Sequence, residues 1–145
     1  MRDLVNHMAQ TSKTMTASAE RAARPEGEEH LGDDPVASFA AAATAAQAAW
    51  HADGALDGNV EIPFDMPAQV ALSINVLDVG THVWDLASAL GQDHGLSAEA
   101  IAAIDSANRM VVSDQVRSGG GFGEDLGPQG DDALANMLAF VGRKA

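Results

Sequence analysis

Two aspartates and a histidine stand close together in the segment "VLDVGTHVWDLA", from Val76 to Ala87. Asp78 and His82 are four residues apart, and Asp85 follows three residues later. In an α-helix, residues three or four apart lie on one face, so these side chains point in one direction. A carboxylate oxygen and an imidazole nitrogen one turn apart can bind the same metal ion at about 2.0 to 2.2 Å. The alternative is a solvent-exposed polar face, and a metal site also needs a third ligand.

His7 is the histidine best placed to be that third ligand. It belongs to a helix predicted over residues 1–23, at the edge of the apolar stripe, where a side chain can reach a cleft between helices. The other histidines lie in an acidic loop, at a helix end and in a turn, at His30, His51 and His94. Taken alone, His7 is typical of a surface histidine. With Asp78 and His82 it forms a set of two histidines and one carboxylate, which leaves coordination positions open.

The composition restricts the classes of function. The chain has 145 residues, enough for one domain that buries roughly two thirds of its unfolded surface. It has no cysteine, which excludes disulfides, thiolate zinc sites and a cysteine nucleophile. A net charge of -13 argues against binding to nucleic acid or to an anionic membrane. No signal peptide and no long apolar run are visible, so we expect a cytoplasmic protein. The partner that we expect is a small-molecule substrate.

The periodicity predicts an all-α fold of five helices in a single domain over residues 1–145. Asp34 and Pro35 begin a helix that runs to His51, and a long helix over residues 67–90 ends at Gly91. Ser97 begins the fourth helix, and Asp131 or Asp132 begins the last one. Residues 25–34 are predicted to be a solvated loop and residues 117–130 a glycine-rich connection. The segment 60–64 is extended but too short to define a sheet.

The helix over residues 67–90 is predicted to be largely buried. No Lys, Arg or Glu occurs between Glu61 and Glu99, although these residues usually cover the wet side of a helix. Its polar side chains fall in one stripe, made of Asn75, Asp78, Thr81, His82 and Asp85. The candidate ligands therefore belong to the most central element of the expected bundle.

Four short motifs resemble a known group of proteins. They are "RDLVNHM" from Arg2, "DVGTHVWDLASALG" from Asp78, "RSGGGFG" from Arg117 and "LANMLAFVGR" ending at Arg143. In this order they resemble the actinobacterial branch of the DinB-like proteins, which are related to the amino-terminal domain of the mycothiol-dependent maleylpyruvate isomerase. The similarity extends over essentially the whole chain.

The resemblance implies a four-helix bundle that holds a divalent metal, typically zinc, at His7, Asp78 and His82. The isomerase has glutamate where this chain has Asp78, which is one methylene shorter. Members of the family usually have a further helix ahead of the "RDLVNHM" segment, so we expect a bundle that lacks the family's first helix. A face formed by Leu4, Met8 and Met15 would then be exposed and would favour a homodimer.

The leading hypothesis is a metal-dependent enzyme in which the cation activates a thiol cosubstrate for attack on an electrophilic small molecule. By resemblance the thiol is mycothiol, and the activity is that of an S-transferase or isomerase. One alternative is a thiol-independent tailoring enzyme of secondary metabolism, acting as a cyclase, isomerase or hydrolase. The other alternative is a non-catalytic module that binds a small molecule or a partner.

Four residues are weaker candidates for the surroundings of the site. Asp85 is expected to orient a metal ligand, to be an exposed acid or to form a salt bridge to Arg2. Asn75 belongs to the same polar stripe. Phe122 lies in a glycine-rich loop that could close over the site or be a plain connection, and Phe64 lies in a segment that could line its mouth.

Overall fold

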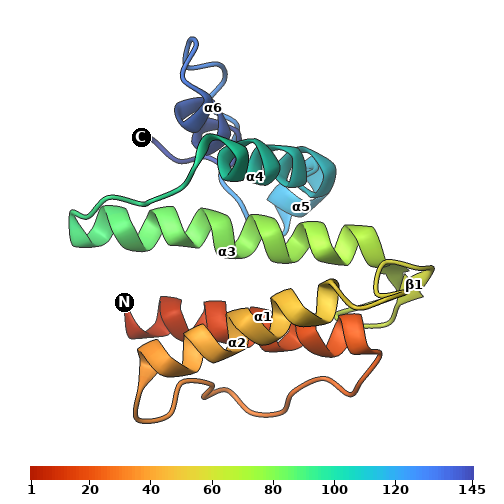
Figure 1. Ribbon diagram of the computed structural model, residues 1–145. Helices are drawn as coiled ribbons and strands as arrows, with labels where there is room; N and C mark the ends of the chain where they lie inside the picture. Colours follow the sequence, from red (N-terminus) through yellow and green to blue (C-terminus); the bar gives the residue numbers. More distant parts are fainter.

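One long helix forms the centre of the protein. The computed structural model describes all 145 residues. Helix α3 (Ala68–Leu90) lies between α1 (Arg2–Glu20) and α2 (Pro35–Trp50) on one side and the remaining helices on the other (Figure 1). Those are α4 (Ala98–Val111), the short α5 (Asp114–Ser118) and α6 (Ala133–Phe140). The all-α class is confirmed, with six helices instead of the five expected, because Ser113 caps an additional short helix.

The predicted helix starts are confirmed by their capping hydrogen bonds. The side chains of Asp34, Ser97 and Asp132 each accept a hydrogen bond from the backbone N–H three residues later. Gly91 ends α3 in the left-handed conformation, with φ 63°. Local chemistry therefore determines where most of the helices begin or end.

The first helix ends at Glu20, earlier than the predicted residue 23. Arg21 adopts a left-handed conformation with φ 52°, which is uncommon for a residue other than glycine. Its guanidinium group donates hydrogen bonds to the backbone oxygens of Ala55 at 3.0 Å and Asp57 at 2.6 Å. These contacts with a segment far along the chain stabilise the stop, so the sequence around Pro25 alone could not reveal it.

Residues between α2 and α3 form a two-stranded antiparallel hairpin of β1 (Asn59–Val60) and β2 (Met66–Pro67). Val60 and Met66 are buried in the larger core cluster, together with Met15 and Trp50. A second cluster joins Ile104 of α4 to α6. The hairpin therefore closes one end of the bundle and does not form a separate sheet domain.

The face expected to mediate a homodimer is mostly covered within the chain. Met8 is 1% exposed and Met15 is 3% exposed. Since α2 and α3 both pack on α1, these side chains belong to the interior of one copy. The expectation that they form an exposed face is wrong.

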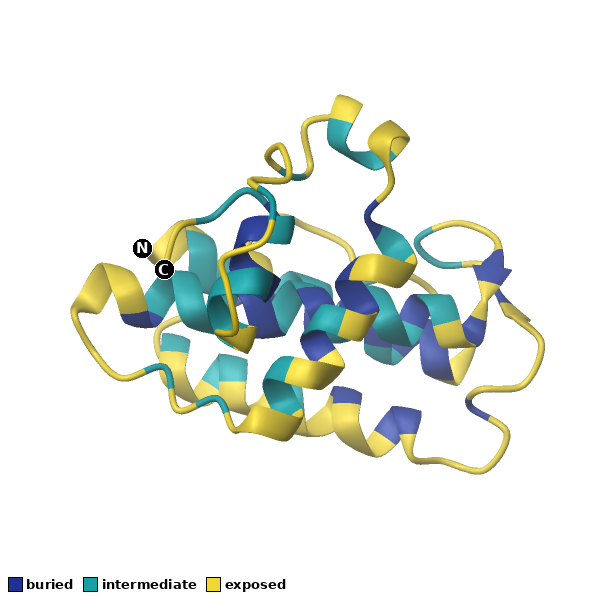
Figure 2. Cartoon of the chain, turned by 90° about the horizontal axis from the view of Figure 1, so that it is seen from above, coloured by how far each residue is buried: buried dark blue, intermediate teal, exposed yellow.

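The loop over residues 25–34 is only partly solvated, contrary to the expectation from its charge. His30 and Leu31 are buried, because Lys13 donates a hydrogen bond to the His30 carbonyl and Asn6 accepts one from the His30 N–H. The rest of this loop is largely exposed, as are the other connections in Figure 2. A loop rich in acidic residues thus contributes the side chain of Leu31 to the core.

The central helix is covered along most of its length, as predicted. Every residue from 70 to 87 is buried or half-buried. Gly80 lets α4 approach closely, because a Cβ atom at this position would lie 2.5 Å from Cδ1 of Ile104. No helix of the protein combines the length and the apolar character needed to cross a membrane.

Candidate metal centre

The antiparallel packing of α1 and α3 brings the candidate ligands together. In Figure 1, α1 runs from its start at the left, and α3 runs back in the opposite direction above it. The first third of α1 therefore lies beside the second half of α3. His7 comes from α1, and Asp78 and His82 come from consecutive turns of α3. The structure thus joins residues that are 71 positions apart in the chain.

Both histidines direct their Nε2 atoms at the same carboxylate oxygen. Nε2 of His7 lies 2.9 Å from Oδ1 of Asp78, and Nε2 of His82 lies 3.8 Å from that atom. The two imidazole rings are nearly perpendicular, with centroids 5.1 Å apart. One ligand atom from each of the three residues falls within 4.8 Å of the other two.

These separations suit a single divalent cation. Ligand atoms bound tetrahedrally at about 2.0 to 2.2 Å lie roughly 3.3 to 3.6 Å from one another. The distances of 2.9 and 3.8 Å from Oδ1 of Asp78 lie on either side of that range. Binding an ion would therefore require Nε2 of His7 to move away from Oδ1 of Asp78 and Nε2 of His82 to move toward it, starting from three ligand atoms that all lie within 4.8 Å of one another.

Burial and charge also favour a cation at this place. Oδ2 of Asp78 is buried and has no hydrogen-bond partner, although an unpaired buried carboxylate oxygen is costly. The hydrogen bond to Asp78 raises the pKa of His7, although partial burial opposes the change. The imidazole of His7 is 48% exposed, so the site is open to solvent on the α1 side.

Asp85 has the orienting contact that was one of its three expected roles. Its Oδ2 atom lies 2.8 Å from Nδ1 of His82, so the imidazole has Nδ1 tied to Asp85 and Nε2 facing Asp78. Burial raises the pKa of the Asp85 carboxyl, but hydrogen bonds from His82 and Arg143 outweigh that effect and lower it to about 2. The two alternatives are wrong, because the Asp85 side chain is only 22% exposed and Arg2 pairs with Glu29.

Arg143 is the residue of this site that the sequence did not reveal. Its Nε and Nη2 atoms donate to the two oxygens of Asp85, at 2.7 and 2.8 Å. The only sequence signal was its place in the closing motif "LANMLAFVGR" of a chain with just eight Lys and Arg residues. Nothing in that motif indicates a partner 58 residues earlier in the chain.

The structure gives the three remaining candidates other surroundings. The side-chain oxygen of Asn75 accepts a hydrogen bond from Trp50 of α2, and Asn75 does not line the hollow that adjoins His7 and Asp78. Phe64 is 64% exposed on the hairpin. The connection that contains Phe122 packs instead against the end of the chain, where Gly123 meets Gly142. The positions of these side chains depend on tertiary contacts, which helical spacing alone does not predict.

A hollow of about 200 Å³ adjoins the candidate metal centre. It is lined by residues of α1, α3, the hairpin and the loop after α1, namely His7, Gln10, Thr11, Thr14, Met15, Arg24, Pro63, Ile74 and Asp78. Neither Phe64 nor Phe122 is among them. The hollow provides space for a small polar molecule directly beside two of the three ligands.

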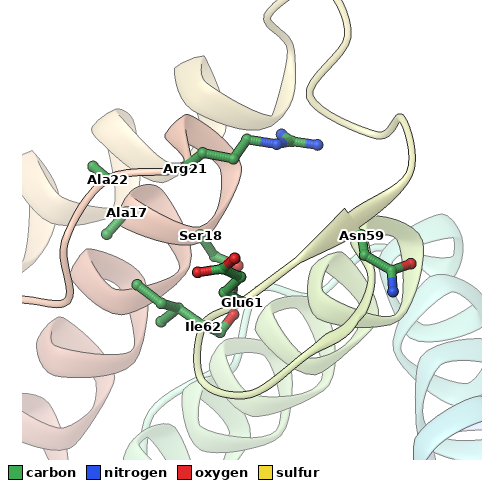
Figure 3. Close-up of a pocket in the computed structure, with 7 residues that line it drawn as sticks. All are labelled: Ala17, Ser18, Arg21, Ala22, Asn59, Glu61 and Ile62. Carbon is green, nitrogen blue, oxygen red and sulfur yellow. Dashed lines mark hydrogen bonds between the residues drawn. The ribbon is translucent and has the colours of Figure 1, made fainter.

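A second hollow lies where the hairpin meets the end of α1 (Figure 3). In this view the guanidinium of Arg21 extends away from the carboxylate of Glu61. Ser18 donates a hydrogen bond of 2.6 Å to the Ile62 carbonyl, so its hydroxyl holds the hairpin against α1. The side chains of Ser18 and Arg21 make structural hydrogen bonds here, and none of the three candidate ligands lines this hollow.

Comparison with known proteins gives relatives but no assigned chemistry. No family model matches the chain, and no solved structure matches it. Two proteins from strains of Mycobacterium tuberculosis, "Uncharacterized protein MT0763" and "Uncharacterized protein Rv0738", are each 31% identical to it over 148 residues. The alignment covers 97% of this chain and 78% of each relative. The chain belongs to the same protein family as these two mycobacterial proteins.

Proposed function

We propose that the protein is a metal-dependent enzyme of the DinB-like superfamily, and that His7, Asp78 and His82 hold one divalent cation. The observation that carries this proposal is the convergence of three ligand atoms within 4.8 Å from two separate helices. Two imidazole nitrogens and one carboxylate oxygen form a donor set that suits zinc, which is our first choice. Since three ligands leave coordination positions open, the set is typical of a catalytic and not a purely structural site.

Each residue of the proposed site has a distinct role in binding the cation. His7 and His82 supply neutral nitrogen donors, and Asp78 supplies a negative charge on a buried oxygen. The Asp85 carboxylate accepts a hydrogen bond from Nδ1–H of His82 and so keeps Nε2 free to bind. When bound, the cation supplies Lewis acidity that lowers the pKa of a thiol or water molecule at an open position.

The proposed reaction uses a thiol from outside the protein. The chain has no cysteine, so a sulfur nucleophile has to come from a cosubstrate. The resemblance to the mycothiol-dependent isomerase group makes mycothiol the proposed thiol, with an electrophilic small molecule as the second substrate. The hollow beside His7 and Asp78 is open and has several polar side chains, which supports binding of a small polar molecule there.

A second candidate function, the binding of an apolar small molecule, is supported by a different part of the surface. A hollow of about 400 Å³ lies between α2, α3 and α4, and 10 of its 15 lining residues are hydrophobic. Trp50, Val76 and Val79 are among them, whereas His7, Asp78 and His82 are not. Binding here would not need the metal, so His82→Ala would leave the affinity for an apolar probe unchanged.

Cobalt substitution tests the thiol step directly. The protein is loaded with Co²⁺, and N-acetylcysteine or mycothiol is added while the absorption spectrum is recorded. We expect a sulfur-to-cobalt charge-transfer absorption in the wild-type protein and none in the His82→Ala variant. Cobalt that binds without any response to either thiol would contradict the thiol step and favour thiol-independent metal catalysis.

A further inference from the structure

The two glycine-containing motifs in the last third of the chain meet each other. A Cβ atom on Gly142 would lie only 2.6 Å from the Cα atom of Gly123, and Gly142 has φ +80°. Both features favour glycine, because any other side chain would collide or strain the backbone. The glycine-rich connection therefore crosses the end of the chain at a distance that only a residue without a side chain allows.

Arg117 stabilises the packing of Gly123 against Gly142. Its guanidinium donates hydrogen bonds to the Gly123 carbonyl and, at 2.7 Å, to the Phe140 carbonyl. It also lies over the Phe140 ring, with Cζ 4.8 Å from the ring centroid. One side chain thus ties the end of α6 to the connection that precedes it.

The residue that follows the crossing is Arg143, which reaches α3. Its two nitrogens engage both oxygens of Asp85, a paired geometry that fixes the carboxylate in direction as well as position. Arg143 and Asp85 are 23% and 22% exposed, so the pair is screened from water to a large extent. Asp85 in turn contacts Nδ1 of His82.

We infer that Arg143 is a positioning residue for the metal centre, acting through Asp85 to hold the His82 imidazole with Nε2 toward Asp78 and His7. The Gly123–Gly142 crossing holds Arg143 in place for this task. The inference rests on the proposed function insofar as the imidazole is positioned for a metal. It assigns a role to the motifs "RSGGGFG" and "VGR", whose residues lie outside the three-ligand set.

The physical reason is the choice between the two neutral forms of the imidazole. A neutral histidine carries its proton on one nitrogen and offers a lone pair on the other. An ionised Asp85 accepts a hydrogen bond from Nδ1–H and leaves the lone pair of Nε2 available to a metal. Losing Arg143 would release the carboxylate from its fixed direction, so His82 would sample other orientations and the other neutral form.

Zinc affinity of matched variants tests the inference. Wild-type protein, Arg143→Met and Arg143→Lys are compared by competition with a chromophoric chelator. Arg109→Met serves as the matched control, because Arg109 contacts the Phe140 ring beside the crossing but forms its ion pair with Asp105 and not with Asp85. We expect Arg143→Met to weaken zinc binding by roughly 10- to 100-fold, the range typical for residues that orient metal ligands. Arg143→Lys should restore part of the loss, since it keeps the charge without the paired geometry, and Arg109→Met should bind like the wild type.

A second readout separates this inference from the proposed function. Long-range ¹H–¹⁵N spectra of metal-free protein report which nitrogen of His82 carries the proton. We expect the Nδ1-protonated form in the wild type and a mixture of forms in Arg143→Met. Wild-type zinc affinity in a folded Arg143→Met variant would overturn the inference. If the wild-type chain binds no zinc, the proposed function fails, and an unchanged His82 spectrum in Arg143→Met would then overturn the inference as well.

Discussion

Replacing Asp85 by asparagine should lower stability in a pH-dependent way. The Asp85 carboxyl has a pKa of about 2 in the folded protein against an ordinary value of 3.8. Each unit of difference corresponds to about 1.4 kcal/mol, so the ionised carboxylate contributes about 2 kcal/mol to the free energy of unfolding at neutral pH. Asparagine keeps the size of the side chain but cannot form the charged pair with Arg143.

The sign of the pH dependence follows from the lowered pKa. Stability from a carboxyl with a depressed folded pKa is fully present above its unfolded pKa and is lost as the pH falls through the folded pKa. The difference between wild type and Asp85→Asn should therefore be about 2 kcal/mol at pH 7 and should shrink between about pH 4 and pH 2. Urea denaturation at several pH values from 7 downward measures this difference.

A surface ion pair provides the matched control for this experiment. Glu29 pairs with Arg2 at 3.3 Å, and the two side chains are 59% and 51% exposed. Exposed pairs of this kind contribute little to stability, so Glu29→Gln should have a smaller effect. A cost for Asp85→Asn that is no larger than the control, or that stays constant from pH 7 to pH 3, would refute the reasoning.

Three further predictions address the site and the helix packing. In metal-free protein, Asp78→Asn should lower the pKa of His7, because the carboxylate hydrogen bond raises it; an NMR titration in which the His7 pKa does not move would contradict this. Gly80→Ala should cost about 1 to 3 kcal/mol in urea denaturation, since its Cβ would collide with Ile104, and equal stability would argue against the close approach of α3 and α4. Asn108→Leu should raise the free energy of unfolding by about 1 kcal/mol, because both amide atoms of Asn108 are buried without a partner, and a lower melting temperature would count against that account.

The sequence predicted those parts of the fold that depend on local signals. Asp34 with Pro35, Ser97 and Gly91 mark helix ends through caps and backbone preference, and the structure places helix ends there. The end of α1 at Arg21 was missed, because it depends on carbonyl groups more than thirty residues away. The buried Leu31 was missed for the same reason, since its loop is held by side chains of α1.

The part of the candidate site that depends on local spacing could also be predicted from the sequence. Helical spacing alone places Asp78, His82 and Asp85 on one face of α3. His7 was found by excluding the other histidines, and its approach to Asp78 requires the packing of α1 on α3. Arg143 could not be found in this way, because its contact with Asp85 results from the way the end of the chain folds back over α3.

Zinc titration tests most directly whether three side chains bind one cation. Protein purified without an affinity tag is stripped of metal and titrated in competition with a chromophoric chelator. The variants His7→Ala, Asp78→Ala and His82→Ala are compared with His51→Ala, which removes an exposed histidine at the end of α2. We predict one zinc ion per chain in the wild type and in His51→Ala, with that binding lost in each of the other three variants. A wild-type chain that binds no zinc, or the same binding in all four variants, would contradict the account.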